Sequence, residues 1–374
     1  MKKILVPIVN RTNYSKLRPI LKNLKRRAEV KLVLTSGASI EDLSSIREDI
    51  QKDGHCNIAS IDSCLRSDSH ASMSKNIALS MIQYSSMLDV EKPDLVLIVG
   101  DRFDMHGYAL TSAIQNVKIA HIQGGERSGT IDDKIRFSIT ALSDYHFVST
   151  KKSAFNVLSA GADESCVFNL GCPAVEHINE LSESSVFSFD DLKKYSKRPL
   201  STLKDAGEYI LVQVHPNTVD NNDVKMEELL YALSTLEVPS IILYPNIDAN
   251  SGDVIKSMRK FKKVKNFYYY KHFSLPVFVS LMKNAKCFMG NSSAIIRESA
   301  LFGTPAINLG NRQVRRESNA NVFDCEFSQD DILKTYGSIK DRIFEKQNLY
   351  FVEDSSLKIS NKIMEILKEK PEAK

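Results

Sequence analysis

The sequence predicts an α/β protein with two Rossmann-like domains, and three observations lead to that fold class. The chain has 374 residues, enough for two domains that each bury a full core. Short apolar runs alternate with helical segments along it, as in parallel sheets whose strands are joined by crossover helices. About ten such runs exceed what one open sheet of this kind usually carries, so two sheets are expected.

The predicted strands fall into two sets of five. They cover residues 3–9, 30–35, 95–99, 119–123 and 145–148, then 209–214, 240–244, 267–270, 287–290 and 305–309. We place the N-terminal domain at 1–170 and the C-terminal domain at 171–356, with the switch near Gly171 and a polar helix and connection over 180–206. Residues 357–374 begin with a helix whose apolar face carries Ile359, Ile363, Ile366 and Leu367, and this helix is expected to rejoin the first domain.

Composition narrows the class of protein. Hydrophobic residues make up 43% and charged residues 26%, and the net charge of +4 is too small to indicate a nucleic-acid or membrane partner. The N-terminal apolar stretch is too short for a signal peptide and is predicted as a strand. The six cysteines lack CxxC spacing, so we expect reduced thiols and a cytoplasmic protein. No grouping has metal-ligand spacing, so no metal is expected.

The segment after the first strand has no GxGxxG pattern, which argues against a tightly bound dinucleotide and a dehydrogenase. Asn10 to Lys16 instead open a helix there. A helix N-terminus attracts anions, and Arg11, Ser15 and Lys16 would add donors. A polar cap with solvated side chains is the alternative interpretation.

Acidic residues follow two neighbouring strands of the first half. Asp101 and Arg102 come after 95–99, whereas Gln123 ends the strand 119–123 and Glu126 follows it. Carboxyl ends of adjacent parallel strands form the site edge of an open α/β sheet, so these residues are predicted to meet. Asp132 and Arg136 follow at i and i+4, on one face of a helix. His121, within the second strand, is expected to be a core residue.

The second half has its own polar cluster after the strand 287–290. Asn291, Ser292 and Ser293 are predicted to start a helix that binds a diphosphate or simply to cap it, and Glu298 on that helix could hold ribose hydroxyls. His215 follows a strand and is placed on a loop facing the interdomain crevice, where it could contact phosphate or act catalytically by shuttling protons. Two turns, 303–305 and 310–313, are expected near the same sheet edge.

These motifs resemble the hydrolysing UDP-N-acetylglucosamine 2-epimerases, above all the epimerase domain of the bifunctional enzyme of the sialic-acid pathway. The matches run over nearly the whole chain, in order: Asn10-Arg11 with Tyr14-Ser15-Lys16-Leu17, Gly100 to Asp104, Gly124 to Asp133, Gly171-Cys172-Pro173, His215-Pro216, Pro245 to Ala249, Gly290 to Ser293 and Phe302 to Gly310. The resemblance implies a GT-B arrangement with the active site in the interdomain cleft. It also implies two sets of site residues. Around the nucleotide it places Arg11, Ser15, Arg102, His215, Asn246, Ser292, Ser293, Glu298 and Arg312; around the sugar it places Asp101, residue 123, Asp132 and Arg136.

The implied reaction eliminates UDP from UDP-N-acetylglucosamine to give a 2-acetamidoglucal and then adds water to give N-acetylmannosamine. Base, acid and cations are required, and no cofactor is. Many members carry Glu where this chain has Gln123, which cannot act as a base. Three explanations stay open: Glu126 replaces it, the glutamine is an engineered substitution, or the protein binds without efficient turnover.

Other departures concern the substrate and its regulation. A Gly-x-His element is missing from 36–40 and a Tyr-Gly motif from 41–50, and Ile295 replaces a small residue, so a diacetamido sugar on UDP or GDP is an alternative substrate. Lys256 and Arg259 stand where the animal enzyme binds a CMP-sialic acid inhibitor, with a solvated helix face as the alternative. The resemblance also suggests a homodimer or homotetramer. A glycosyltransferase is the remaining competing class.

Overall fold

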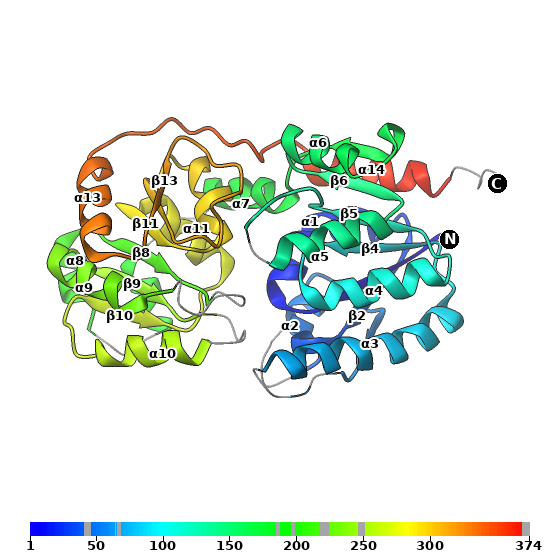
Figure 1. Cartoon of the computed structure of the whole chain (residues 1–374), viewed down its shortest axis with the longest axis horizontal. Helices are drawn as coiled ribbons and strands as arrows, with labels where there is room; N and C mark the ends of the chain where they lie inside the picture. Colours follow the sequence, from blue (N-terminus) through cyan, green and yellow to red (C-terminus); the bar gives the residue numbers. More distant parts are fainter. Residues whose placement is uncertain are drawn as a thin grey trace. The chain divides into compact units, whose positions relative to one another are not determined.

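The computed structural model describes residues 1–40, 46–63, 65, 69–129, 131–184, 188–195, 199–216, 224–245 and 251–368. The chain divides into two compact units (Figure 1). Unit 1 comprises Met1–Glu126, Asp132–His177 and Tyr350–Lys374; unit 2 comprises Arg127–Ile131 and Ile178–Leu349.

Unit 1 contains a seven-stranded sheet in the order β3-β2-β1-β4-β5-β6-β7, and its strand pairs are parallel. The strands are β1 (Lys3–Ile8), β2 (Glu29–Leu34), β3 (Ile58–Ser60), β4 (Leu95–Val99), β5 (Ile119–Ile122), β6 (Tyr145–Val148) and β7 (Val167–Asn169). The helices are α1 (Arg11–Leu24), η1 (Ser36–Ala38), α2 (Ile46–Lys52), α3 (His70–Glu91), α4 (Phe103–Ile114), α5 (Ile131–Leu142), α6 (Lys151–Ser159), η3 (Glu164–Cys166) and α14 (Ser355–Ile366), while α7 (Pro173–Ser184) carries the chain into unit 2.

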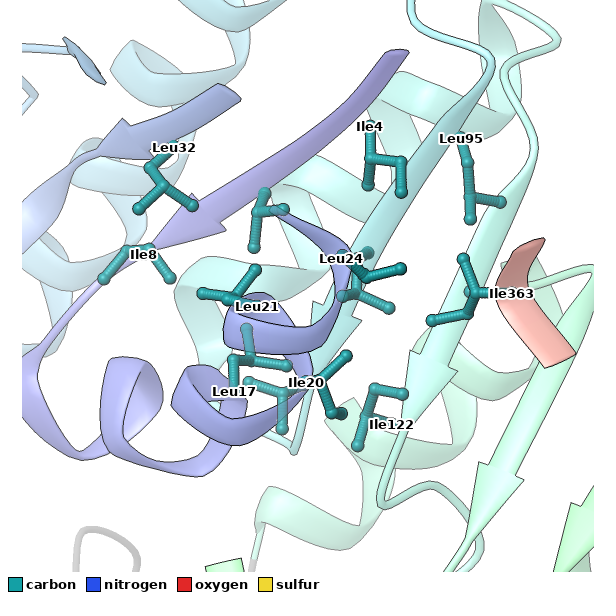
Figure 2. Packing of buried hydrophobic residues seen from close by; sticks show 14 of the residues in the cluster. Ile4, Ile8, Leu17, Ile20, Leu21, Leu24, Leu32, Leu95, Ile122 and Ile363 are labelled. Carbon is teal, nitrogen blue, oxygen red and sulfur yellow. The ribbon is translucent and has the colours of Figure 1, made fainter. Parts of the chain in front are cut away.

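Both faces of the unit 1 sheet are covered, because successive strand residues point to opposite sides. Ile4 and Ile8 of β1 belong to the cluster formed with α1, and Ile363 of α14 joins the same cluster beside Leu95 of β4 (Figure 2). Leu5 of β1 packs on the other face against residues of α3, α4 and α5, Tyr108 among them. The C-terminal helix is further tied to α1 by the Ser360 hydroxyl, which donates to the Ile20 carbonyl at 3.3 Å.

Unit 2 repeats this plan with six parallel strands in the order β10-β9-β8-β11-β12-β13. The strands are β8 (Ile210–Gln213), β9 (Ser240–Leu243), β10 (Phe267–Tyr270), β11 (Cys287–Gly290), β12 (Ala306–Leu309) and β13 (Val322–Cys325). The helices are η4 (Phe189–Lys194), α8 (Ser201–Ala206), α9 (Met226–Leu236), α10 (Ser251–Lys260), α11 (Leu275–Asn284), α12 (Ser293–Arg297), η5 (Ser299–Leu301) and α13 (Gln329–Ile339). A core of β8, β11 and β12 side chains packs against α9, α10 and α13.

The predicted fold class is confirmed, since both units are α/β with parallel sheets. The predicted strands are present with ends within one residue or so, and the prediction missed β3, β7 and β13. The prediction that the turns 303–305 and 310–313 share a sheet edge is wrong. The first turn precedes β12 and the second follows it, so the strand separates them. No helix in the described part of the chain is both long and apolar enough to span a membrane.

Strand order reverses at β1/β4 in unit 1 and at β8/β11 in unit 2. In open parallel sheets, ligands bind beyond the carboxyl ends of the strands at such a switch point. The segments after these strands begin at Val9, Gly100, Val214 and Asn291, and they contain four of the eight motifs that the sequence singled out.

Candidate functional site

Arg136 of α5 contacts both acidic loops of unit 1. Its side chain is 1% exposed and forms an ion pair with Asp101, at the end of β4. Nη1 donates to the Asp133 carboxylate at 2.9 Å and also to the backbone carbonyl of Glu126. The loop after β4, the loop after β5 and the first turn of α5 therefore converge on one buried guanidinium. This convergence matches the prediction that the two strand ends meet.

The structure adds Asp133 to the predicted set. Asp132 and Arg136 both lie on α5 as expected, but the carboxylate that contacts Arg136 at i−3 belongs to Asp133. The side chain of Asp101 is 25% exposed and that of Asp133 is 16% exposed, so both carboxylates retain contact with solvent. The signal for Asp133 was its spacing, because i,i+3 pairs are neighbours on a helix as i,i+4 pairs are.

Gln123 lies where β5 ends, with φ of 64° and 1% of its surface exposed. Its backbone N–H donates to the Phe147 carbonyl at 2.8 Å, and its side-chain Nε2 donates to the Cys172 Sγ at 3.1 Å. A carboxamide can donate this bond, whereas an ionised Glu carboxylate is only an acceptor. In this contact the neutral amide of Gln123 is the donor and the Cys172 sulfur is the acceptor.

The Gly124-Gly125 pair is required by close packing of this loop. A Cβ on Gly125, where φ is 76°, would lie 2.2 Å from the Ser153 carbonyl oxygen. A Cβ on Gly124 would lie 2.8 Å from Nδ1 of His121. The turn that places Glu126 thus depends on two residues without side chains. Glu126 itself is buried.

Arg102 is the residue before α4, at its N-cap position, and its side chain is held by Asp104. Its Nε donates to the Asp104 carboxylate at 2.8 Å, and the Ser36 hydroxyl donates to the other oxygen of that buried carboxylate at 2.8 Å. Ser36 has φ of 51°, in the left-handed region. The part of the chain that lacks the expected Gly-x-His element therefore still contacts the Gly100–Asp104 motif. Sequence reasoning missed this link.

The start of α1 lies at the end of β4. Asn10 caps the helix by accepting from the Asn13 N–H at 2.8 Å, and Asn13 Nδ2 donates to the Val99 carbonyl at 3.3 Å. A Cβ on Gly100 would be 3.8 Å from Nζ of Lys16, so the ammonium group is close to the Asp101 loop. Arg11 pairs with Asp49 of α2 at 3.1 Å. The Ser15 hydroxyl donates to the Arg11 carbonyl at 3.0 Å.

In unit 2, Asn291 joins the carboxyl ends of β8 and β11. Its Oδ1 accepts from the His215 N–H at 2.7 Å, and its Nδ2 donates to the His215 carbonyl at 2.8 Å. Nη1 of Arg312, beyond β12, donates to the Asn291 carbonyl at 3.0 Å. His215 is buried, and the structure brings it, Asn291 and Arg312 together. Its predicted orientation toward a crevice stays a prediction.

Ser292 and Ser293 begin α12, and the local capping interpretation holds: Ser292 Oγ accepts from the Ala294 N–H at 3.4 Å. Glu298 is the C-cap of α12, which ends at Arg297, and its N–H donates to the Ala294 carbonyl at 3.0 Å, so it continues the last turn of the helix as expected. Gly290 must lack a side chain, since a Cβ there would lie 2.0 Å from the Gln213 carbonyl oxygen.

Some predicted residues are not placed by these contacts. Asn246 lies outside the described residues. Lys256 and Arg259 are exposed on α10, whose buried side chains are Val254 and Met258, and the proposed inhibitor contact stays a prediction. Within the described ranges, no group of three or more His, Cys, Asp or Glu residues could hold a metal ion.

Comparisons with known proteins match this architecture. The family profile described as UDP-N-acetylglucosamine 2-epimerase matches residues 22–366. A hydrolysing UDP-N,N'-diacetylbacillosamine 2-epimerase of Legionella pneumophila is 29% identical over 89% of this chain and 87% of its own. A hydrolysing GDP/UDP-N,N'-diacetylbacillosamine 2-epimerase of Campylobacter jejuni is 33% identical over 76% of this chain and 73% of its own.

A UDP-N-acetylglucosamine 2-epimerase of Neisseria meningitidis is 26% identical over 89% of this chain and 86% of its own. Among solved structures, a UDP-GlcNAc 2-epimerase from Neisseria meningitidis bound to UDP-GlcNAc superposes with a TM-score of 0.80 at 18% identity, covering 97% of this chain and 100% of that one. The corresponding Methanocaldococcus jannaschii enzyme gives a TM-score of 0.81 at 17% identity, covering 97% and 99%. These superpositions show a shared fold.

Proposed function

The chain belongs to the UDP-N-acetylglucosamine 2-epimerase family, and from that membership we propose that it hydrolyses a UDP-linked 2-acetamido sugar to UDP and the free sugar inverted at C2. The observation that carries the proposal is the convergence of the two acidic loops and α5 on Arg136. Epimerisation at a weakly acidic C–H needs several acid and base groups at one place.

The proposed reaction has two steps. A base removes the C2 proton, the electron pair of that bond forms the C1=C2 double bond, and the C1–O bond breaks so that UDP leaves. Water then adds across the glycal, with hydroxyl to C1 and a proton to C2 from the opposite face. The overall reaction consumes one water and needs no oxidant.

We assign the acid and base roles to Asp101, Glu126 and Asp132. Arg136 would orient Asp101 and the Glu126 loop, and Gln123 would be structural, since its amide already donates to Cys172. The reaction needs one group to remove the C2 proton and another to deliver a proton to C2 from the opposite face, so more than one carboxylate is assigned. Glu126 would thereby take the role that the family resemblance implies for position 123.

For the nucleotide, we propose Arg11, Ser15, Lys16 and Arg102 in unit 1 and a second group in unit 2. The second group is His215, Asn246, Ser292, Ser293, Glu298 and Arg312. Cationic and N–H donors there would stabilise the negative charge on departing UDP.

We place UDP-N,N'-diacetylbacillosamine first as the substrate. The two relatives named for it are 29% and 33% identical to this chain, against 26% for the Neisseria meningitidis enzyme named for UDP-N-acetylglucosamine. The altered 36–40 segment also departs from the pattern expected for the latter. UDP-N-acetylglucosamine is the second candidate, with the same chemistry.

The test incubates the protein with each UDP-sugar in deuterated water and follows UDP release and deuterium at C2 of the free sugar. The proposal expects UDP release with one deuteron at C2, and a higher kcat/KM for the diacetamido substrate. Binding of the UDP-sugar without release of UDP would favour a sugar-nucleotide-binding protein with little catalysis. UDP loss that requires an acceptor sugar would favour a glycosyltransferase.

Paired variants test the assignment of Glu126. Glu126→Gln should lower kcat by about 10²- to 10⁴-fold, the usual contribution of a general acid or base. Gln123→Glu should not raise kcat, because the new carboxylate would face the Cys172 sulfur. An unchanged rate in Glu126→Gln together with a faster Gln123→Glu enzyme would reverse the assignment.

A further inference from the structure

His121 touches three elements that carry the proposed acids. It lies on β5, two residues before Gln123, and its side chain is fully buried. The sequence suggested only a core residue. Its contacts extend to the loop after β4, the loop after β5 and α5, all within unit 1.

The first contact fixes the loop that carries Asp101. Nε2 of His121 lies 2.8 Å from the Gly100 carbonyl oxygen. A carbonyl only accepts, so Nε2 bears the proton and donates. The Gly100 carbonyl belongs to the planar peptide that contains the Asp101 N–H, so this bond holds the plane of that peptide.

The second contact fixes α5. With Nε2 protonated, neutral imidazole has an acceptor at Nδ1, and Thr140 Oγ1 lies 3.2 Å from it. Thr140 is one helical turn beyond Arg136, on the same side of α5. This bond therefore holds the helix that supplies Asp132 and Arg136.

The third contact fixes the loop that carries Glu126. A Cβ on Gly124 would lie 2.8 Å from Nδ1 of His121 and 3.1 Å from Thr140 Oγ1. The backbone of Gly124 thus packs directly against the imidazole and the threonine hydroxyl. Any displacement of the ring would shift the peptide two residues before Glu126.

The protonation state agrees with this arrangement. Burial lowers the pKa of His121 to about 4, and the hydrogen bond to the Gly100 carbonyl offsets part of this by raising the pKa. His146 on β6, the register neighbour of His121, also favours the neutral ring. At neutral pH the imidazole keeps one donor and one acceptor, which is the pattern that its two partners need.

We propose that His121 is a positioning residue that holds the Asp101 loop, the Glu126 loop and α5 in the geometry required for catalysis. It touches no reacting atom in this role and acts through Gly100, Gly124 and Thr140. The catalytic half of this inference rests on the proposed function, whereas the coupling of the three elements does not.

The experiment uses Thr140→Val, which removes the hydroxyl donor with little change in volume, and Thr140→Ser, which keeps it. In Thr140→Val we expect kcat to fall about 10- to 100-fold with KM within about twofold, since misplacement by an ångström or so costs this much. Thr140→Ser should recover most of the rate. Thr111→Val is the matched control, because Thr111 is a buried helical threonine that donates only to the Gly107 carbonyl of its own helix at 2.7 Å.

Hydrogen exchange supplies a readout that does not depend on substrate. The backbone amides of residues 100–102 and 124–126 should exchange faster in Thr140→Val than in wild type. In Thr111→Val their exchange rates should equal those of wild type. If wild type fails to turn over UDP-sugars while this exchange pattern is found, the proposed function fails and the coupling stands. Equal exchange in all variants, or a kcat loss as large in Thr111→Val as in Thr140→Val, would overturn the role of His121.

Discussion

Replacing Arg136 by glutamine tests whether the buried guanidinium holds unit 1 together at its acidic edge. Arg136→Gln removes the cation from two carboxylates and the donor from the Glu126 carbonyl. Removing one member of a buried ion pair costs about 3–5 kcal/mol, because the remaining charge is left without compensation. The carboxylates of Asp101 and Asp133 are 25% and 16% exposed, so water relieves part of that penalty. We therefore expect a loss of about 3 kcal/mol in the free energy of unfolding.

The assay is urea unfolding followed by circular dichroism, with hydrogen exchange to assign the transition of unit 1. A slope of roughly 1–3 kcal/mol per molar urea converts the loss into a midpoint shift of about 1–3 M. Lys134→Gln is the control, since Lys134 is exposed on the same helix and should change stability by less than about 0.5 kcal/mol. A loss below about 1 kcal/mol in Arg136→Gln, or an equal loss in the control, would refute the reasoning.

Three further changes probe the fold. Gly125→Ala should destabilise the protein by more than about 3 kcal/mol, because its Cβ would meet the Ser153 carbonyl at 2.2 Å. Gly161→Ala, also at positive φ but with open space around it, should cost only about 1 kcal/mol of backbone strain. Thermal unfolding of the two variants compares these losses, and equal losses would contradict the packing argument. Ile363→Ala should lower the free energy of unfolding by about 2–5 kcal/mol, because it leaves a cavity between α14 and α1. Leu357→Ala, on the exposed side of α14, should lower it much less. Urea midpoints give both values, and an unchanged midpoint in Ile363→Ala would mean that α14 does not contribute to the unit 1 core. Burial lowers the pKa of His146 to about 4, so as the pH falls the unfolded chain binds a proton at this histidine before the folded protein does. The stability contributed by the neutral ring is therefore full above pH 6.5 and is lost as the pH falls toward 4. Near pH 5, a plot of unfolding free energy against pH should be less steep by about 1 kcal/mol per pH unit in His146→Gln than in wild type, and an unchanged slope would show that His146 does not titrate this way.

The sequence predicted the strands that are rich in apolar residues and missed the ones that are not. β4, β6, β10 and β11 have the predicted bounds, because their apolar runs end sharply at polar or glycine residues. β3 and β7 have three residues each, and their side chains are half-buried or exposed. Such edge strands have no run of buried residues to mark them, and only pairing with β2 and β6 makes them strands.

The candidate site shows the same division. Placing Asp101 and Glu126 at the ends of neighbouring strands follows from the alternation of strands and helices and needs no coordinates. The partners of these residues do not follow from it. Asp104 meets Ser36, 68 residues earlier, and Gln123 meets Cys172, 49 residues later, through contacts that no local pattern encodes.

The sequence by itself therefore determined the two-sheet α/β class, the family and the strand ends at which polar residues gather. These properties depend on hydrophobic periodicity and on motif order, both of which are local in the chain. Only the tertiary structure decided that Arg136 joins three acidic segments, that Gln123 faces a thiol and that His121 connects both loops to α5. Each of these depends on the packing of segments distant in sequence, where the space left by neighbouring backbones selects which side chains meet.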